Sequence, residues 1–183
     1  MFPFVVPVSP TVVIGPFTED YIITPGNVAG LRNSLMVYNF LAGPETTLRN
    51  MSWGFVDVRD VAVQMIAGIK ITGKHRLISV GPWFDNKEVI EYITSIRPDL
   101  KGQLASVVST SQNRPLADPS TATKVLGLPE PTSWKQAIAD TLEATLKVEE
   151  EWIKVGVDVK SLKENKVLQT QISAGNSDVA FTD

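Results

Sequence analysis

The sequence predicts an α/β protein built on a parallel sheet. Strand-like and helix-like segments alternate along its 183 residues, and a hydrophobic share of 43% is enough to bury one sizeable core. Residues 4–14 are rich in β-branched side chains and apolar on both faces, as in a strand of a sheet covered on both sides. The run Phe55 to Ala62 is a short apolar strand that turns at once into a helix.

Two helices are predicted in the first half of the chain. Residues 27–42 form the first, which Asn27 opens and Gly43-Pro44 closes. Asp57 is predicted to cap the second, with Asp60 near the positive end of the helix dipole. Apolar residues recur in the second helix at steps of three and four, which predicts one buried face formed by Val58, Val61, Met65, Ile66 and Ile69.

A short strand and a third helix are predicted next. Residues 76–80 form the strand. Asp85 and Glu88 have the spacing of a capping box at the start of the helix. The buried face behind this box is predicted to contain Val89, Ile90, Ile93 and Ile96.

Two further helices are predicted in the last third of the chain. Asp118-Pro119 opens one and Gly127 ends it, with proline at the first position and glycine just past the end. Ser133 and Gln136 cap the other, whose mixed apolar face contains Trp134, Ile138, Thr141, Thr145 and Trp152. Residues 1–154 are therefore predicted to form the folded portion. The run 149–151 is predicted to be solvated, and residues 155–183 to be a divergent, partly disordered tail.

Composition and charge exclude several classes of protein. The net charge is −3 and no basic stripe occurs, so we expect no nucleic-acid partner. The absence of cysteine excludes a disulfide framework, a thiol nucleophile and a cysteine zinc site. The apolar N-terminus is broken by prolines, lacks a charged leading region and is too short to span a bilayer. We therefore expect no membrane partner and a cytoplasmic location.

Few side chains have the pattern of a chemical site. His75 is the only histidine, so a two-histidine metal site or a catalytic triad cannot form, and a solvated turn residue is expected. Asp57 and Asp60 could form a carboxylate pair, although helix capping explains both. No metal-binding residue is predicted.

Five short motifs follow one another over residues 4–148. They are the strand ending in Pro-x-x-Val-x-Gly-Pro at 8–16, Leu-Arg-Asn-Ser at 31–34, the run from Phe55 to Ala62, Gly-Lys-His-Arg followed by an aliphatic strand at 73–80, and the segment 118–128. In this order they resemble the C-terminal half of extended short-chain dehydrogenases/reductases, in the NAD-dependent epimerase/dehydratase superfamily. The similarity is closest to the fungal ketoreductase, methylglyoxal-reductase and dihydroflavonol-reductase branch. It implies the C-terminal part of a Rossmann-like parallel sheet plus a small, mostly helical substrate-binding region.

Two parts of such enzymes do not occur in this sequence. It contains no glycine-rich fingerprint whose backbone amides would cradle the cofactor pyrophosphate. None of Tyr21, Tyr38 and Tyr92 is followed four positions later by lysine, so the family's catalytic Tyr-x-x-x-Lys pair is missing. The resemblance therefore implies no catalytic residue in this chain, and it places Met1 just downstream of the active site.

For this chain, the resemblance implies only residues that lie near an NADP cofactor, and none of the family's main cofactor-binding groups. It implies that Pro10, Thr11 and Val12 lie near the nicotinamide and that Ser34 lies near the sugar-phosphate side. The alternative for the first three residues is that they form an ordinary strand terminus followed by a Gly-Pro turn. The alternative for Ser34 is an ordinary hydroxyl in the first turns of a helix. At Arg32 the sequence departs from the family, which tends to have asparagine there.

Four aromatic residues lie near loops that line the variable substrate pocket in the family. They are Phe17, Trp53, Trp83 and Phe84. The alternative is that they are ordinary core residues.

Two functions of different classes follow. The first is the substrate-side half of an NAD(P)H-dependent reductase of a carbonyl or ketone, arising from a shortened gene, splice form or gene model and inactive alone. The second is a noncatalytic module that pairs with a reductase subunit or another partner through the edge of its sheet. In both, leaving ~400 Å² of the apolar first strand in water forfeits about 10 kcal/mol. The isolated chain is therefore expected to be marginally stable, to aggregate, or to oligomerise through that edge.

Overall fold

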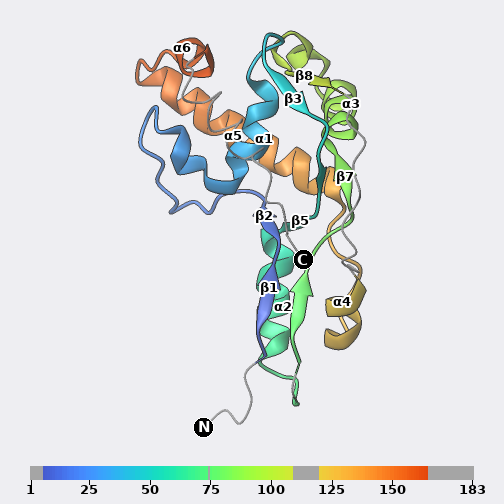
Figure 1. Cartoon of the computed structure of the whole chain (residues 1–183). Helices are drawn as coiled ribbons and strands as arrows, with labels where there is room; N and C mark the ends of the chain where they lie inside the picture. Colours follow the sequence, from blue (N-terminus) through green and yellow to red (C-terminus); the bar gives the residue numbers. More distant parts are fainter. Residues whose placement is uncertain (1–5, 74, 109–119, 165–183) are drawn as a thin grey trace, which may run out of the picture.

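The computed structural model describes residues 6–73, 75–108 and 120–164 (Figure 1). The strands are β1 (Val8–Pro10), β2 (Val12–Ile14), β3 (Thr47–Arg49), β4 (Ser52–Trp53), β5 (Phe55–Asp57), β6 (Leu77–Ser79), β7 (Phe84–Asp85) and β8 (Ser106–Val108). The α-helices are α1 (Leu35–Tyr38), α2 (Val58–Gly68), α3 (Asn86–Ile96), α4 (Ser120–Leu126), α5 (Trp134–Lys154) and α6 (Val159–Glu164). Three 3-10 helices complete the order: η1 (Val28–Ser34), η2 (Asn39–Leu41) and η3 (Pro98–Gln103).

The strands form four two-stranded ladders, of which three are parallel. Strand β1 pairs with β6, and β2 pairs with β5, with Ile14 opposite Asp57. Strands β3 and β8 form the third parallel pair, and β4 runs antiparallel to β7. The predicted α/β class with parallel strands is confirmed.

The prediction of one continuous strand over residues 4–14 is wrong for the described part of that range. The segment forms two three-residue strands that pair with different partners, β6 and β5. Pro10 ends the first strand because it has no amide hydrogen for the ladder. The backbone amide of Thr11 then donates to the carbonyl of Ser79 at 3.0 Å, after which the chain moves on to β5.

The prediction of one helix over residues 27–42 is also wrong. The segment consists of η1, the four-residue helix α1 and η2, and the Asn27 side chain makes no capping hydrogen bond. Arg32 has φ 53° and ψ −131°, which interrupts the helical hydrogen-bond ladder inside η1. The predicted end is correct, because Gly43 adopts φ 91° directly after Ala42.

The predicted caps of the three longer helices are confirmed. The Asp57 carboxylate accepts from the backbone amide of Arg59 at the start of α2. Asp85 and Glu88 form a reciprocal capping box at α3, with hydrogen bonds of 2.9 and 2.8 Å. At α5 the Ser133 hydroxyl accepts from the backbone amide of Gln136.

The core surrounds α5, which crosses the upper part of the molecule in the view of Figure 1. Helix α5 contacts α1, α3, β2 and β5, and its predicted apolar face is buried at Ile138, Thr141, Thr145 and Trp152. On α3, Val89 and Ile93 are fully buried as predicted, whereas Ile96 is exposed. No helix in the described ranges has the length and apolar character needed to cross a bilayer.

The predicted buried face of α2 is wrong. Met65, Ile66 and Ile69 are 58%, 59% and 70% exposed, and Val58 is exposed too. The side chain that α2 buries is instead Gln64. The residues Val58, Ala62, Met65, Ile66 and Ile69 are all exposed and together form an apolar surface, which we call the α2 stripe.

The C-terminal part of the described chain is folded through Glu164. Helix α6 buries Val159 against the core, inside the segment 155–183 that the sequence predicts as a divergent tail. Residues 165–183 lie outside the described residues, as does the predicted helix start at Asp118-Pro119.

Candidate functional site

The residues predicted to lie near the nicotinamide sit where the chain passes from β1 to β2. Pro10 is the last residue of β1, Thr11 lies between the strands, and Val12 begins β2. The Thr11 hydroxyl donates to the Ser79 carbonyl at 3.4 Å, so its side chain is held against β6. These positions are exposed or half-buried, and each has a structural role in the change of strand partner.

A hollow of about 210 Å³ lies just beyond the carboxyl ends of β2 and β5. In open α/β sheets, this is the side of the strands on which ligands bind. The Gly15-Pro16 turn lines the hollow together with Val58, the first residue of α2. A side chain at residue 15 would place its Cβ 2.6 Å from a Val58 methyl, and φ is 144° there, so this turn requires glycine.

Ser34 is among the residues that line this hollow, whereas Pro10, Thr11 and Val12 are not. Its side chain is only 6% exposed and makes no capping hydrogen bond. The structure therefore brings Ser34 next to the end of β2, but it separates Ser34 from the other three predicted contacts.

One wall of the hollow is aromatic. The rings of Phe17 and Tyr21 stack with their centroids 5.3 Å apart and their planes 7° from parallel. The Tyr21 hydroxyl donates to the carbonyl of Gly30 at 2.9 Å, which fixes the outer ring. The exposed cation Arg32 lies on the same rim.

The other three aromatic residues that were predicted to lie near the pocket have different surroundings. Phe84 is fully buried, and its ring stacks on Trp134 at 4.9 Å, so it is a core residue. The Trp83 ring covers Gly54 so closely that a Cβ there would come within 2.7 Å of it. The side chain of Trp53 lies outside what the structure describes.

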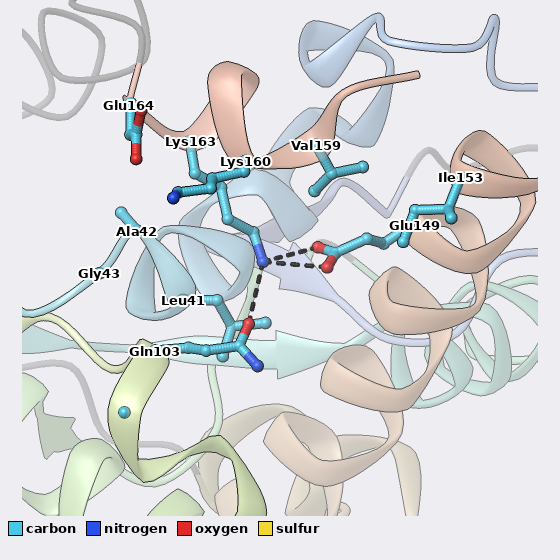
Figure 2. A pocket seen from close by; sticks show the side chains of 11 residues that line it. Leu41, Ala42, Gly43, Gln103, Glu149, Ile153, Val159, Lys160, Lys163 and Glu164 are labelled. Carbon is cyan, nitrogen blue, oxygen red and sulfur yellow. Dashed lines mark hydrogen bonds and ion pairs between the residues drawn. The ribbon is translucent and has the colours of Figure 1, made fainter. Parts of the chain in front are cut away.

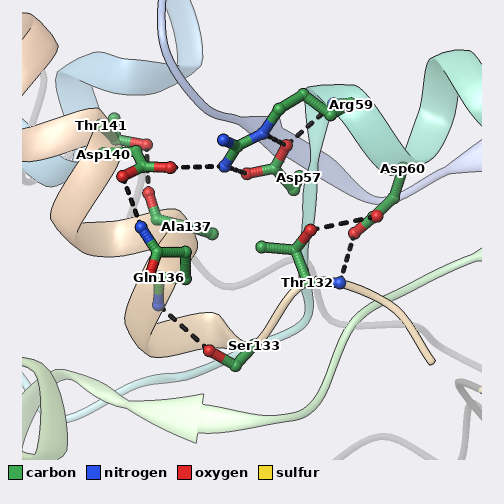
Figure 3. A network of polar contacts seen from close by, with 9 residues as sticks. All are labelled: Asp57, Arg59, Asp60, Thr132, Ser133, Gln136, Ala137, Asp140 and Thr141. Atoms are coloured by element: carbon green, nitrogen blue, oxygen red, sulfur yellow. Dashed lines mark hydrogen bonds and ion pairs between the residues drawn. The ribbon is translucent and has the colours of Figure 1, made fainter.

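A network of polar contacts joins the start of α2 to the start of α5 (Figure 3). Arg59 binds both carboxylate oxygens of Asp57 at 2.7 Å and also donates to Asp140 at 2.6 Å. Asp140 in turn accepts from the Gln136 side chain at 2.6 Å. We call the contacts of Asp57, Arg59 and Asp140 the arginine clasp. The hydrogen bond to Asp57 is the largest of the effects that raise the pKa of Arg59.

Asp60 has a separate partner, so the two aspartates do not act as a carboxylate pair. Its oxygens accept from the Thr132 amide at 2.8 Å and from the Thr132 hydroxyl at 3.1 Å (Figure 3). The pKa of Asp60 is raised, chiefly by partial burial, although the two hydrogen bonds from Thr132 act in the opposite direction. The sequence predicted capping from the Asp57 run, but not the long-range contacts that both carboxylates make.

A larger pocket of about 440 Å³ lies between α5, α6 and η3 (Figure 2). On its wall, Lys163 and Glu149 form an ion pair at 2.8 Å, with side chains only 13% and 12% exposed. The Tyr38 hydroxyl donates to the same carboxylate at 2.6 Å. Burial, followed by this hydrogen bond, raises the pKa of Tyr38, so its proton is held tightly at neutral pH.

This cluster corrects the prediction that the acidic run at 149–151 is simply solvated. Glu149 is held by α1 and α6, and Lys163 also donates to the side chain of Gln103 at 3.3 Å. The partners are 14 to 111 residues away along the chain, so no local pattern marks them. The cluster joins α6 to the core.

No group of three metal-ligating side chains occurs in the ranges that the structure describes. A ring nitrogen of His75 lies 3.1 Å from the carbonyl of Thr72, in the turn before β6. His75 lies in the connection before β6, as predicted, but it is half-buried and not fully solvated.

Comparison with known proteins identifies the fold. No protein-family model matches the chain, and no curated protein sequence does. Yeast methylglyoxal/isovaleraldehyde reductase Gre2, complexed with NADPH, is similar with a TM-score of 0.58 and 23% identity, over 78% of this chain and 47% of that protein. Vestitone reductase from alfalfa (Medicago sativa) is similar with a TM-score of 0.53 and 11% identity, over 80% of this chain and 45% of that protein. MoeE5 in complex with UDP-glucose and NAD is similar with a TM-score of 0.52 and 16% identity, over 76% of this chain and 46% of that protein.

Over 76–80% of its length, the chain has the same fold as part of each of these three proteins. It spans a little under half the length of each of these proteins. The α/β class expected from the five motifs is therefore confirmed at the level of the fold. The hollow at the ends of β2 and β5 is the candidate functional site of this portion.

Proposed function

We propose that the chain is the C-terminal, substrate-side portion of an NAD(P)H-dependent reductase that acts on a carbonyl group. The observation that carries the proposal is the fold similarity to reductases such as Gre2, which was crystallised with NADPH, over less than half of their length. A nicotinamide cofactor supplies hydride to a carbonyl carbon. This chain would contribute the turn after β2, the aromatic wall and Ser34 to the side of the site where that transfer takes place.

The arrangement of the unpaired surfaces supports this proposal. Strand β1 has a single partner, β6, among the described residues, so one of its edges carries no strand. The α2 stripe beside it is apolar and exposed. Both features suit a second α/β layer that adds strands to β1 and covers α2.

A noncatalytic pairing module is the second candidate. It is supported by the absence, within these 183 residues, of both the glycine-rich fingerprint and a Tyr-x-x-x-Lys pair. The same edge and the same stripe would serve that function. The two candidates differ in whether the paired assembly reduces a carbonyl.

The purified chain alone is expected to show no carbonyl-dependent oxidation of NADPH. A positioned general acid contributes ~10²–10⁴-fold to such a reaction, and this sequence has no residue pair of the required pattern. The measurement is cofactor absorbance over a panel of aldehydes and ketones, with heated protein as the control.

The same panel, repeated after co-expression with the N-terminal half of a close homologue, tests the proposed function. That half would end just after its Tyr-x-x-x-Lys helix. Activity of the pair supports the reductase. A stable pair without activity favours the noncatalytic module. Activity of the chain alone would contradict the proposal that the catalytic general acid lies outside these 183 residues.

Binding of NADPH to the chain alone is expected to be no tighter than about millimolar, or roughly −4 kcal/mol. The reason is that this sequence lacks the glycine-rich turn whose helix amides would bind the pyrophosphate. Titration calorimetry measures it, with the co-expressed pair as the positive control. Micromolar affinity of the chain alone would require a second phosphate site in these residues.

A further inference from the structure

Arg32 has an unusual backbone conformation next to the candidate site. It is the single non-glycine residue with positive φ in the described ranges, at φ 53° and ψ −131°. Such conformations cost on the order of 1–3 kcal/mol and persist where the surrounding structure holds them. Here the kink sets Arg32 on the rim of the hollow and leaves Ser34 at the start of α1, lining the same hollow.

The guanidinium of Arg32 is an exposed cation without a carboxylate partner among the described residues. Two other arginines, in contrast, bind carboxylates: Arg59 binds Asp57 and Asp140, and Arg97 binds Asp99 and Glu143. An unpaired guanidinium beside a hollow favours a ligand with a phosphate or carboxylate group, which it can bind through two parallel hydrogen bonds.

The remaining lining of the hollow defines the rest of such a ligand. Phe17 and Tyr21 stack face to face, so a ligand ring can lie flat on an outer face of the pair, and Tyr21, which is 40% exposed, is the more accessible ring. Ile14 and Leu31 are buried residues of the lining, and Ser34 adds one hydroxyl. A flat ring, a polar hydroxyl-bearing linker and one anionic group match these surfaces.

We propose that the hollow is an anion subsite in which Arg32 binds the phosphate of a mononucleotide whose ring lies against Phe17 and Tyr21. The ligand class rests on the proposed function, in which this portion faces the nicotinamide end of a dinucleotide. The anion preference rests on Arg32 itself. At the corresponding place the resembling family tends to have asparagine, so the cation would be a feature of this chain.

The test is a titration of the whole chain with nicotinamide mononucleotide, followed by amide NMR shifts. Nicotinamide riboside, which lacks the phosphate, is the matched ligand. The variant is Arg32→Gln, and Arg49→Gln, an exposed arginine on β3, is the matched control. We expect Arg32→Gln to weaken binding of the mononucleotide roughly three- to tenfold and to leave riboside binding unchanged. Arg49→Gln should alter neither.

Phenyl phosphate, titrated in parallel, separates this inference from the proposed function. If phenyl phosphate binding depends on Arg32 while the mononucleotide does not bind, the anion subsite stands and the nicotinamide assignment fails. If Arg32→Gln binds both phosphates as tightly as the unmodified chain does, or if neither phosphate binds the unmodified chain, the inference is overturned.

Discussion

Replacing Arg59 with alanine is expected to lower the free energy of unfolding by about 2–4 kcal/mol, a loss of roughly 5–15 °C in Tm. The Asp57 side chain is 0% exposed, and two of its hydrogen bonds come from the Arg59 side chain. Removing the guanidinium leaves a buried carboxylate with the backbone amide of residue 59 as its remaining donor in the clasp. Because Arg59 itself is 48% exposed, the loss should be near the lower end for a buried ion pair.

Arg97→Ala is the matched control for this experiment. Arg97 also binds two carboxylates at 2.6–2.7 Å, but Asp99 and Glu143 are 58% and 60% exposed. Water can solvate both after the substitution, so the loss should be much smaller. The double variant Asp57→Asn/Arg59→Ala should regain part of the stability lost in Arg59→Ala, because it removes the uncompensated charge and keeps a capping side chain. Equal losses at Arg59 and Arg97 would contradict the clasp.

Replacing Ile66 and Ile69 with glutamine is expected to leave the stability of the isolated chain within about 0.5 kcal/mol of its starting value. Both residues belong to the exposed α2 stripe, at 59% and 70% exposure, so the folded chain loses little packing when they become polar. The same double variant should self-associate less, as measured by sedimentation velocity. An apolar stripe on two exposed helical turns is a surface that associates in water.

Ile93→Gln provides the comparison for a buried isoleucine. Ile93 is fully buried on α3, so this change should cost on the order of 3 kcal/mol or more. If Ile66→Gln/Ile69→Gln destabilised the isolated chain as strongly as Ile93→Gln, the stripe would be buried in solution. The account of an exposed interface would then be wrong.

Patterns in the sequence predicted those features that depend on residues close together along the chain. The caps at Asp57, Asp85 and Ser133 involve partners two or three residues away, so their spacing is visible in the sequence. The buried face of α5 was predicted because its periodicity coincides with packing inside this chain. The motifs that resemble a reductase predicted the fold for a related reason, since they mark strand ends and helix starts.

The failures have equally specific causes. The apolar periodicity of α2 predicted a buried face, but periodicity does not show whether this chain supplies the covering element, and the face is exposed in the described residues. In residues 27–42, helical spacing concealed the positive φ at Arg32, which depends on tertiary context. The contacts of Glu149 with Tyr38 and of Arg59 with Asp140 span 111 and 81 residues, so single-sequence patterns do not contain them.

The proposed function requires that the α2 stripe and the edge of β1 that carries no strand among the described residues receive the other half of a reductase. The direct measurement is the affinity of the chain for the N-terminal half of a close homologue, compared with that of Ile66→Gln/Ile69→Gln. We expect the unmodified chain to bind and the double variant to bind at least about tenfold more weakly, since two buried isoleucines would be lost from the interface. Equal affinity of the two chains, or no binding while both halves are soluble and folded, would contradict the account.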